Sequence, residues 1–441
     1  MYRNHQKRLL TLLADDKHSL VYLKGGSVTH RYGTDYEYPF RQESNFLYLT
    51  GVDEPDMAAF FHCGTGEYTL VIPRRSSRYA VWMGYVQSPQ DYRKAHEPDH
   101  IIYDDEVSGW LKKVAPEKVH CLPGAEEDIR SLGASPETGE LQDAIAYCRV
   151  IKSDGELSLL KKAAAVTNQA HLEVMQSVNP GAREFEMKAI FERHTTGNGL
   201  VHAPYSGIFA SGRSSAILHY TGNQEMLNPG DLFLVDAGAE YRGYAADITR
   251  TCPVNGSFSQ MQADLYDIVL EAQTTTLNMI RPGNKMEELH LQAARIVVKG
   301  LSDLGLISGT VDELMDANVF ALFFPHGLGH FLGLDTHDVG GYPKGTDKID
   351  RPGLRFLRAR RTFEAGMVLT IEPGLYFIPA LLQPALRNEQ YAGHLNADRL
   401  EELFDFGGIR IEDNVIVRED GIENLTTVPK SRHEIEHVMA W

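Results

Sequence analysis

The string FLVD at positions 233–236 constrains the fold more than any other part of this sequence, because a carboxylate ends a run of large apolar residues. Burying Asp236 without a partner would be costly. If the chain reverses at Tyr241 and Arg242, Asp236 lies opposite Asp247 on one face of a hairpin, with the two Cβ atoms about 5 Å apart. Two facing carboxylates repel each other unless a cation lies between them. The hairpin therefore predicts a metal site or, as the alternative, two solvated acids near a turn.

Composition is that of an ordinary folded protein. The chain has 441 residues, of which 43% are hydrophobic and 23% charged, and its formal net charge is −17. This length predicts two or three domains. We expect neither nucleic acid nor a membrane as a partner, because both attract basic rather than acidic surfaces.

The cysteines and the N-terminal segment indicate a reducing compartment. Four cysteines are scattered without a CxxC pair, so the sequence encodes neither a disulfide framework nor a thiolate zinc site. Residues 1–16 contain only short apolar runs between charged residues, too little for a signal peptide or a membrane span. We expect a cytoplasmic protein.

Hydrophobic patterning divides the chain near residue 150. We expect a smaller α/β domain over 1–150 and a larger α+β domain over 156–441, because runs of strands precede runs of helices in the second region. In the first domain a helix is expected over 3–14, and strands over 19–23, 45–50, 57–62, 67–72, 100–103 and 118–122. In the second domain helices are expected over 156–178, 257–280 and 285–304, and strands over 205–210, 216–220, 231–236, 245–253, 368–377 and 409–418. The polar segment 383–403 is expected to be a surface excursion.

Three histidines, His326, His330 and His337, lie in or near a glycine-rich segment. A four-residue spacing suits a helical zinc motif, but Gly327 and Gly329 oppose a helix and the HExxH glutamate is absent. We therefore expect a loop. A single histidine is more often structural than a ligand, but three this close together favour a functional site.

Two further carboxylates fall in strand-like segments. Alternation places Glu372 on the same face as Thr370, and Glu412 on the same face as Arg410. Taken alone, each is more often part of an edge-strand ion pair than of a site. Together with the two aspartates and one histidine they form a set of five hard ligands without cysteine. Such a set suits a pair of divalent ions, with manganese or cobalt at least as plausible as zinc, and predicts metal-assisted hydrolysis.

The chain resembles the pita-bread metallopeptidases, and among them most closely the Xaa-Pro dipeptidases, or prolidases. Five strings carry the resemblance in family order: HYTGN, DAGAEYRGYAADITRT, HGLGHFLGLDTHDVGG, GMVLTIEPGLYF and GGIRIEDNVIV. They cover nearly all of 156–430. The string FRQESNF at 40–46 is similar to one found in both prolidases and Xaa-Pro aminopeptidases. The resemblance implies a C-terminal pita-bread domain preceded by a smaller N-terminal α/β domain.

The resemblance also implies a ligand set for two divalent ions, with Mn2+ favoured over Co2+ or Zn2+. The five ligands it implies are Asp236, Asp247, His330, Glu372 and Glu412. In this scheme Asp247 and Glu412 bridge the ions, and Glu372 also takes the proton of the attacking water.

Further residues take roles by the same similarity. His326 and His337 would line the cleft and stabilise the intermediate, and His219 would contact the substrate. Arg410 would brace Glu412. Thr249, on the face of Asp247, is either a support for the metal ligands or an ordinary strand threonine.

Arg358 matches the prolidase arginine that binds the free carboxylate of the substrate, a role that suits a guanidinium fork. The alternative is a solvated basic run, because three other arginines crowd this segment: Arg355, Arg360 and Arg361. The 40 residues between Glu372 and Glu412 form the longer insertion typical of prolidases.

The activity implied is hydrolysis of dipeptides with proline at the C-terminal position, by a homodimer. An Xaa-Pro aminopeptidase acting on longer peptides is the nearest alternative. A non-catalytic interaction domain and metal-free creatinase-like chemistry are two more, but both predict gaps in the ligand set, and every ligand position is filled.

Overall fold

The computed structural model describes residues 1–440, and the chain divides into two compact units, Met1–Arg149 and Val150–Trp441. The first unit holds a six-stranded mixed sheet in the order β4-β3-β2-β1-β5-β6. Its strands are β1 (Leu20–Lys24), β2 (Ala58–His62), β3 (Tyr68–Ile72), β4 (His100–Tyr103), β5 (Val119–His120) and β6 (Pro136–Glu137). The helices of this part are α1 (Tyr2–Leu12), α2 (Ser44–Thr50), α3 (Ser77–Met83), α4 (Pro89–His96), η1 (Asp104–Glu106), α5 (Val107–Val114), α6 (Glu126–Ser131) and α7 (Leu141–Val150).

The strand predicted over 45–50 is wrong, because this segment is helix α2. The Glu43 side chain caps the helix by accepting a 2.7 Å hydrogen bond from the Phe46 N–H. Gly51, with φ of 68°, ends it in the left-handed conformation. The period of a short apolar run does not distinguish a strand from a buried helix. Here the two caps favour the helix.

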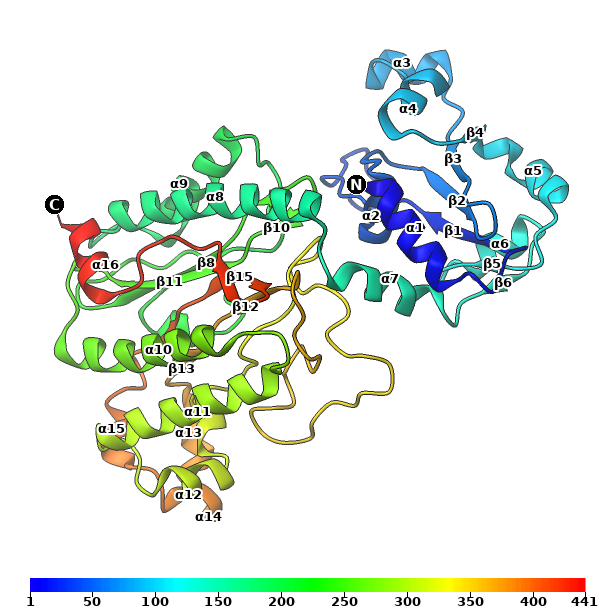
Figure 1. Cartoon of the computed structure of the whole chain (residues 1–441). Helices are drawn as coiled ribbons and strands as arrows, with labels where there is room; N and C mark the ends of the chain where they lie inside the picture. Colours follow the sequence, from blue (N-terminus) through cyan, green and yellow to red (C-terminus); the bar gives the residue numbers. More distant parts are fainter. Residues whose placement is uncertain (441) are drawn as a thin grey trace. The chain divides into compact units, whose positions relative to one another are not determined.

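The second unit places helices on both sides of its strands. Figure 1 shows α8 (Asp154–Ser177) and α9 (Glu184–Gly197) on one side, and α10 (Gln260–Met279) and α11 (Met286–Asp303) on the other. The strands are β7 (Ile208–Ser211), β8 (Leu232–Ala237), β9 (Glu240–Tyr241), β10 (Tyr244–Ala245), β11 (Ile248–Pro253), β12 (Val368–Ile371), β13 (Gly374–Tyr376), β14 (Gly408–Arg410), β15 (Asp413–Arg418) and β16 (Gly421–Asn424). The short helices are η2 (Gly212–Ala216), α12 (Val311–Asp316), η3 (Val319–Leu322), α13 (Pro379–Ala385), α14 (Glu389–Ala392), α15 (Ala397–Glu401) and α16 (Arg432–Met439).

One apolar core joins these layers. It includes Val174 from α8, Phe233 and Val235 from β8, and Leu265 and Val269 from α10, all fully buried or nearly so. Burying a side chain of this size stabilises the fold by about 1.5–3 kcal/mol. The core therefore fixes the strands whose ends carry the polar site.

Three predictions for this unit need correction. Residues 216–220 form no strand, because η2 and the turn bonds from Ile217 N–H to Ser214 O and from Tyr220 N–H to Ile217 O take their place. The strand predicted over 368–377 divides into β12 and β13 at Pro373, which has no N–H to donate. The segment 383–403 is not merely a surface excursion: it contains short helices, and Leu400 is fully buried in the core.

None of the described helices combines the length and the apolar character needed to span a bilayer.

Candidate metal centre

The hairpin of β8 and β11 carries the two aspartates, but in a different register from the one predicted. Tyr241 pairs with Tyr244, so the turn is Arg242-Gly243, and these residues have φ of 51° and 86°. A two-residue hairpin turn of this type needs positive φ at both positions, which favours glycine at the second. Asp236 therefore lies opposite Thr249 rather than Asp247. Asp247 is two residues from Thr249, so it still shares the face of Asp236.

The backbone of Asp247 is held by a side chain that the sequence analysis missed. Its N–H donates to Asn414 Oδ1 at 3.0 Å, and its carbonyl accepts from Asn414 Nδ2. Asn414 is fully buried. Gly238 lets the two strands approach, because a Cβ there would lie 1.8 Å from the Ala246 carbonyl oxygen. The only sequence signal for Asn414 is an amide inside an apolar strand.

Three of the other predicted ligands, Asp247, Glu372 and Glu412, surround His330. His330 Nε2 lies 3.4 Å from Asp247 Oδ2 and 3.7 Å from Glu372 Oε1, which is too long for hydrogen bonds. Ligand atoms of Asp247, His330 and Glu412 all lie within 4.8 Å of one another, and the three residues are 5%, 2% and 2% exposed. His330 Nδ1 is 2.9 Å from the Phe331 carbonyl, so Nδ1 donates to that carbonyl and Nε2 faces the carboxylates.

Arg410 connects the fifth residue, Asp236, to the others. Its Nη2 donates to Asp236 Oδ2 at 2.6 Å, and its Nε donates to Thr249 Oγ1 at 3.3 Å. Thr249 in turn donates to Glu412 Oε2 at 2.7 Å. Arg410 thus contacts Asp236 directly and reaches Glu412 through Thr249. Asp236 Oδ1 is buried and has no hydrogen-bond partner among the described residues.

The buried carboxylates carry more negative charge than the neighbouring cations offset. Burial raises the pKa of Glu372 to about 7 and that of Glu412 well above its usual range, and the neighbouring acids add to both shifts. Burial also raises the pKa of Asp236 against the opposing effect of Arg410. For Asp247, burial acts to raise the pKa, but His330, with Tyr205 and His337, acts in the opposite direction and holds the pKa below its usual value. Hard oxygen donors, one imidazole lone pair and an unpartnered carboxylate oxygen fit divalent cations.

Tyr376 is a second residue that the sequence analysis missed. Its buried hydroxyl accepts from Arg410 Nη1 at 2.8 Å and lies 2.9 Å from His326 Nε2. His326 Nδ1 is 2.8 Å from the Gly327 carbonyl, so that nitrogen carries the hydrogen and Nε2 accepts from Tyr376. Burial lowers the pKa of His326 to about 3, and Arg410 acts in the same direction. The spacing of Tyr376 from Glu372, four residues along an extended segment, is the signal that could have found it.

The remaining predicted residues lie on the exposed side of this group. The ring of His337 is perpendicular to that of His330, with centroids 4.4 Å apart. Burial lowers the pKa of His337 to about 4, and the charges of His330, Arg358 and His219 act in the same direction. Arg358 and His219 are exposed and within electrostatic reach of His337.

A buried glutamate fixes the segment that carries His219. Glu184, at the start of α9, accepts from the N–H groups of Ser211 at 2.7 Å and Glu225 at 3.0 Å, and from the Tyr220 hydroxyl at 2.8 Å. These bonds hold both ends of the segment and the neighbour of His219. Nothing in the sequence alone pairs positions so far apart.

Tyr205 is the last missed residue. Its buried hydroxyl adjoins Asp236 and Asp247, and burial, followed by these carboxylates, raises its pKa well above the usual value. The phenol therefore stays protonated beside two acids.

Known proteins match the whole chain. Residues 158–419 match Metallopeptidase family M24, and residues 2–121 match the Aminopeptidase P N-terminal domain. The human Xaa-Pro dipeptidase is 40% identical over 437 residues, covering 96% of this chain and 89% of that protein. A Talaromyces marneffei protein named as a probable Xaa-Pro aminopeptidase is 38% identical, covering 95% of this chain and 91% of that protein.

Solved structures agree. Aminopeptidase PepP from Pseudomonas aeruginosa superposes with a TM-score of 0.86 at 33% identity, covering 100% of this chain and 97% of that chain. Zinc-substituted Escherichia coli aminopeptidase P gives 0.85 at 34% identity, covering 100% and 98%. The predicted α+β pita-bread fold with a smaller N-terminal domain is confirmed, as is the predicted resemblance. The chain belongs to the M24 metallopeptidases.

Proposed function

We propose that this chain is an Xaa-Pro dipeptidase that uses two divalent ions to hydrolyse dipeptides with proline at the C-terminal position. The observation that carries the proposal is the convergence of buried carboxylates on Nε2 of His330. The 40% identity to the human Xaa-Pro dipeptidase supports the substrate class. We assign catalysis to residues 156–441, with 1–150 as a separate N-terminal domain.

The residues that would hold the two ions are Asp236, Asp247, His330, Glu372 and Glu412, and Asp247 and Glu412 would be shared between the ions. When bound, the two ions would activate a water molecule and polarise the scissile carbonyl. Glu372 accepts the proton of the attacking water on its carboxylate and returns it to the proline nitrogen as the peptide bond breaks. Thr249 and Arg410 hold the carboxylates in place.

The two other histidines of the glycine-rich segment have different roles in this proposal. Both ring nitrogens of His326 are engaged, with Gly327 and Tyr376, so His326 supports the wall beside Glu372, 3.8 Å away. The exposed His337 contacts the tetrahedral intermediate. His219 contacts the substrate.

Arg358 binds the free carboxylate of the dipeptide. Replacing Arg358 by Gln should raise KM for Gly-Pro at least tenfold and leave kcat within threefold, because a guanidinium pairs with a carboxylate through two hydrogen bonds. Arg355→Gln is the matched control, since Arg355 is an exposed neighbour paired with Asp350 at 3.7 Å. Equal KM values for the two variants would remove Arg358 from the proposal.

An Xaa-Pro aminopeptidase is the second candidate, favoured by the fungal relatives and the solved aminopeptidase P structures. Turnover of Gly-Pro compared with Gly-Pro-Ala separates the two. A dipeptidase cleaves Gly-Pro at least tenfold faster, and a preference for the tripeptide overturns the first proposal.

Three more proposals concern the bound metal, the oligomeric state and the cellular compartment of the enzyme. We propose Mn2+ as the bound ion, with Co2+ or Zn2+ as substitutes, because carboxylate-rich sites suit manganese. We also propose a cytoplasmic homodimer. Metal analysis, size-exclusion chromatography with light scattering and cell fractionation test the three points separately.

A further inference from the structure

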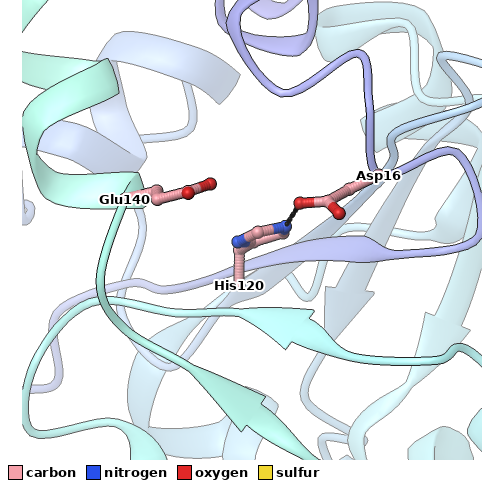
Figure 2. A group of neighbouring side chains, drawn as sticks. All are labelled: Asp16, His120 and Glu140. Carbon is pink, nitrogen blue, oxygen red and sulfur yellow. Dashed lines mark ion pairs between the residues drawn. The ribbon is translucent and has the colours of Figure 1, made fainter.

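A second cluster of possible metal ligands lies in the N-terminal unit, and the proposed peptidase reaction does not use it. It consists of Asp16 in the turn between α1 and β1, His120 at the end of β5, and Glu140 directly before α7 (Figure 2). One ligand atom from each lies within 4.8 Å of the other two.

His120 supplies the observation that points to a ligand. Its side chain is 0% exposed, and its Nδ1 has no hydrogen-bond partner within the described residues. Buried polar groups in proteins nearly always have a hydrogen-bond partner. The ring lies between the two acids, with Nε2 2.9 Å from Asp16 Oδ2 (Figure 2). A buried imidazole whose Nδ1 lacks a partner, beside two carboxylates, fits a bound cation.

The surroundings allow an ion to enter. Lys118 Nζ also lies 2.9 Å from Asp16 Oδ2. Lys118 is 34% exposed, so its ammonium can move into solvent when a cation takes its place, and such partly exposed pairs are only weakly stabilising. Glu140 is exposed and gives access from solvent.

We propose that Asp16, His120 and Glu140 bind one divalent ion of the zinc class. Zinc accepts imidazole nitrogen together with carboxylate oxygen, and three protein ligands leave one position for water. The ion would connect the turn after α1, the two-residue strand β5 and the start of α7. Because the three segments come together only in the folded chain, the ion would bind that state alone and would stabilise it.

Equilibrium dialysis of the full-length chain against Zn2+, with metal measured by mass spectrometry, tests the site. His120→Gln should bind one zinc ion fewer per chain than the unmodified protein. The matched control is His100→Gln, because His100 is an exposed histidine of the same sheet, 3.6 Å from Glu67. It should bind the same number as the unmodified chain. Asp247→Asn combined with Glu412→Gln removes the proposed catalytic ions instead, so the two metal sites are counted independently.

Glu140→Gln protects the test against misfolding, because an exposed side chain can be replaced without disturbing the core. We expect it to weaken zinc binding at the site formed by Asp16, His120 and Glu140 at least tenfold while the circular dichroism spectrum is unchanged. The proposal is overturned if His120→Gln and Glu140→Gln both bind zinc with the number and affinity of the unmodified chain. In that case His120 pairs with Asp16 alone.

Discussion

Replacing Tyr376 by Phe tests the hydrogen-bond chain behind the metal centre. The change deletes one buried oxygen, which accepts from Arg410 at 2.8 Å and donates to His326 at 2.9 Å. A hydrogen bond to a charged group contributes about 1.5–3 kcal/mol and a neutral one about 1 kcal/mol. We therefore expect the free energy of unfolding to fall by about 2.5–4 kcal/mol. Because such supporting contacts typically change activity by about 10–100-fold, kcat should fall by that factor.

The assays for this variant are urea unfolding followed by circular dichroism and steady-state hydrolysis of Gly-Pro. Burial raises the pKa of Tyr376 to about 12, so the phenol donates its hydrogen throughout the usable pH range. Tyr266→Phe is the matched control: its buried hydroxyl donates only to the Lys430 carbonyl at 2.9 Å. It should lose about 1 kcal/mol of stability and no activity. If Tyr376→Phe keeps kcat within twofold of the unmodified enzyme, the hydroxyl does not position His326 and the reasoning fails.

Three further predictions concern the second unit. Thr249→Val removes the 2.7 Å hydrogen bond to Glu412 and should weaken metal binding about tenfold, measured by metal titration; unchanged affinity would make Thr249 an ordinary strand residue. Burial lowers the pKa of His290 to about 3, so between pH of about 6.5 and the folded pKa only the unfolded state binds a proton at this residue. As the pH falls through this range, the free energy of unfolding decreases by about 1.4 kcal/mol per pH unit. His290→Leu should reduce this slope in urea unfolding between pH 4 and 7, and an identical slope would contradict the assignment. Chelation should abolish Gly-Pro hydrolysis, and Mn2+ should restore it; full activity after complete metal removal would refute the metallopeptidase mechanism.

The fold could be predicted wherever a pattern was long. The 3.6-residue period of α8, α10 and α11 extends over many turns, and each helix lies within two or three residues of its predicted range. Secondary structure could not be predicted from short apolar runs. The residues of α2 suit a strand or a helix equally, and the bond from the Phe46 N–H to Glu43 that decides between them is a detail of one turn.

The sequence indicated the residues that converge at the candidate site but not the residues that support them. The motifs of the family resemblance pointed to the proposed ligands, which lie in apolar strand-like segments or among glycines. Asn414 and Tyr376 act through partners that are distant in sequence, such as Asp247, so their roles depend on the tertiary fold. Even the predicted pairing of Asp236 with Asp247 was wrong by one turn residue, because the positive φ of Arg242 moved the turn.

The charge balance of the site links metal binding to protons. Arg410 offsets Asp236, but Glu372 and Glu412 share one buried region with Asp247, and burial raises the pKa of both glutamates. The raised pKa values predict that, without ions, these glutamates hold part of their protons near neutral pH. Ions can bind only to the deprotonated carboxylates, so metal binding must release protons. Calorimetric titration of Mn2+ near pH 7, repeated in buffers of different ionisation enthalpy, should show at least one proton released per chain. A binding enthalpy independent of the buffer would mean that the carboxylates are already ionised and that some other cation of the chain balances them.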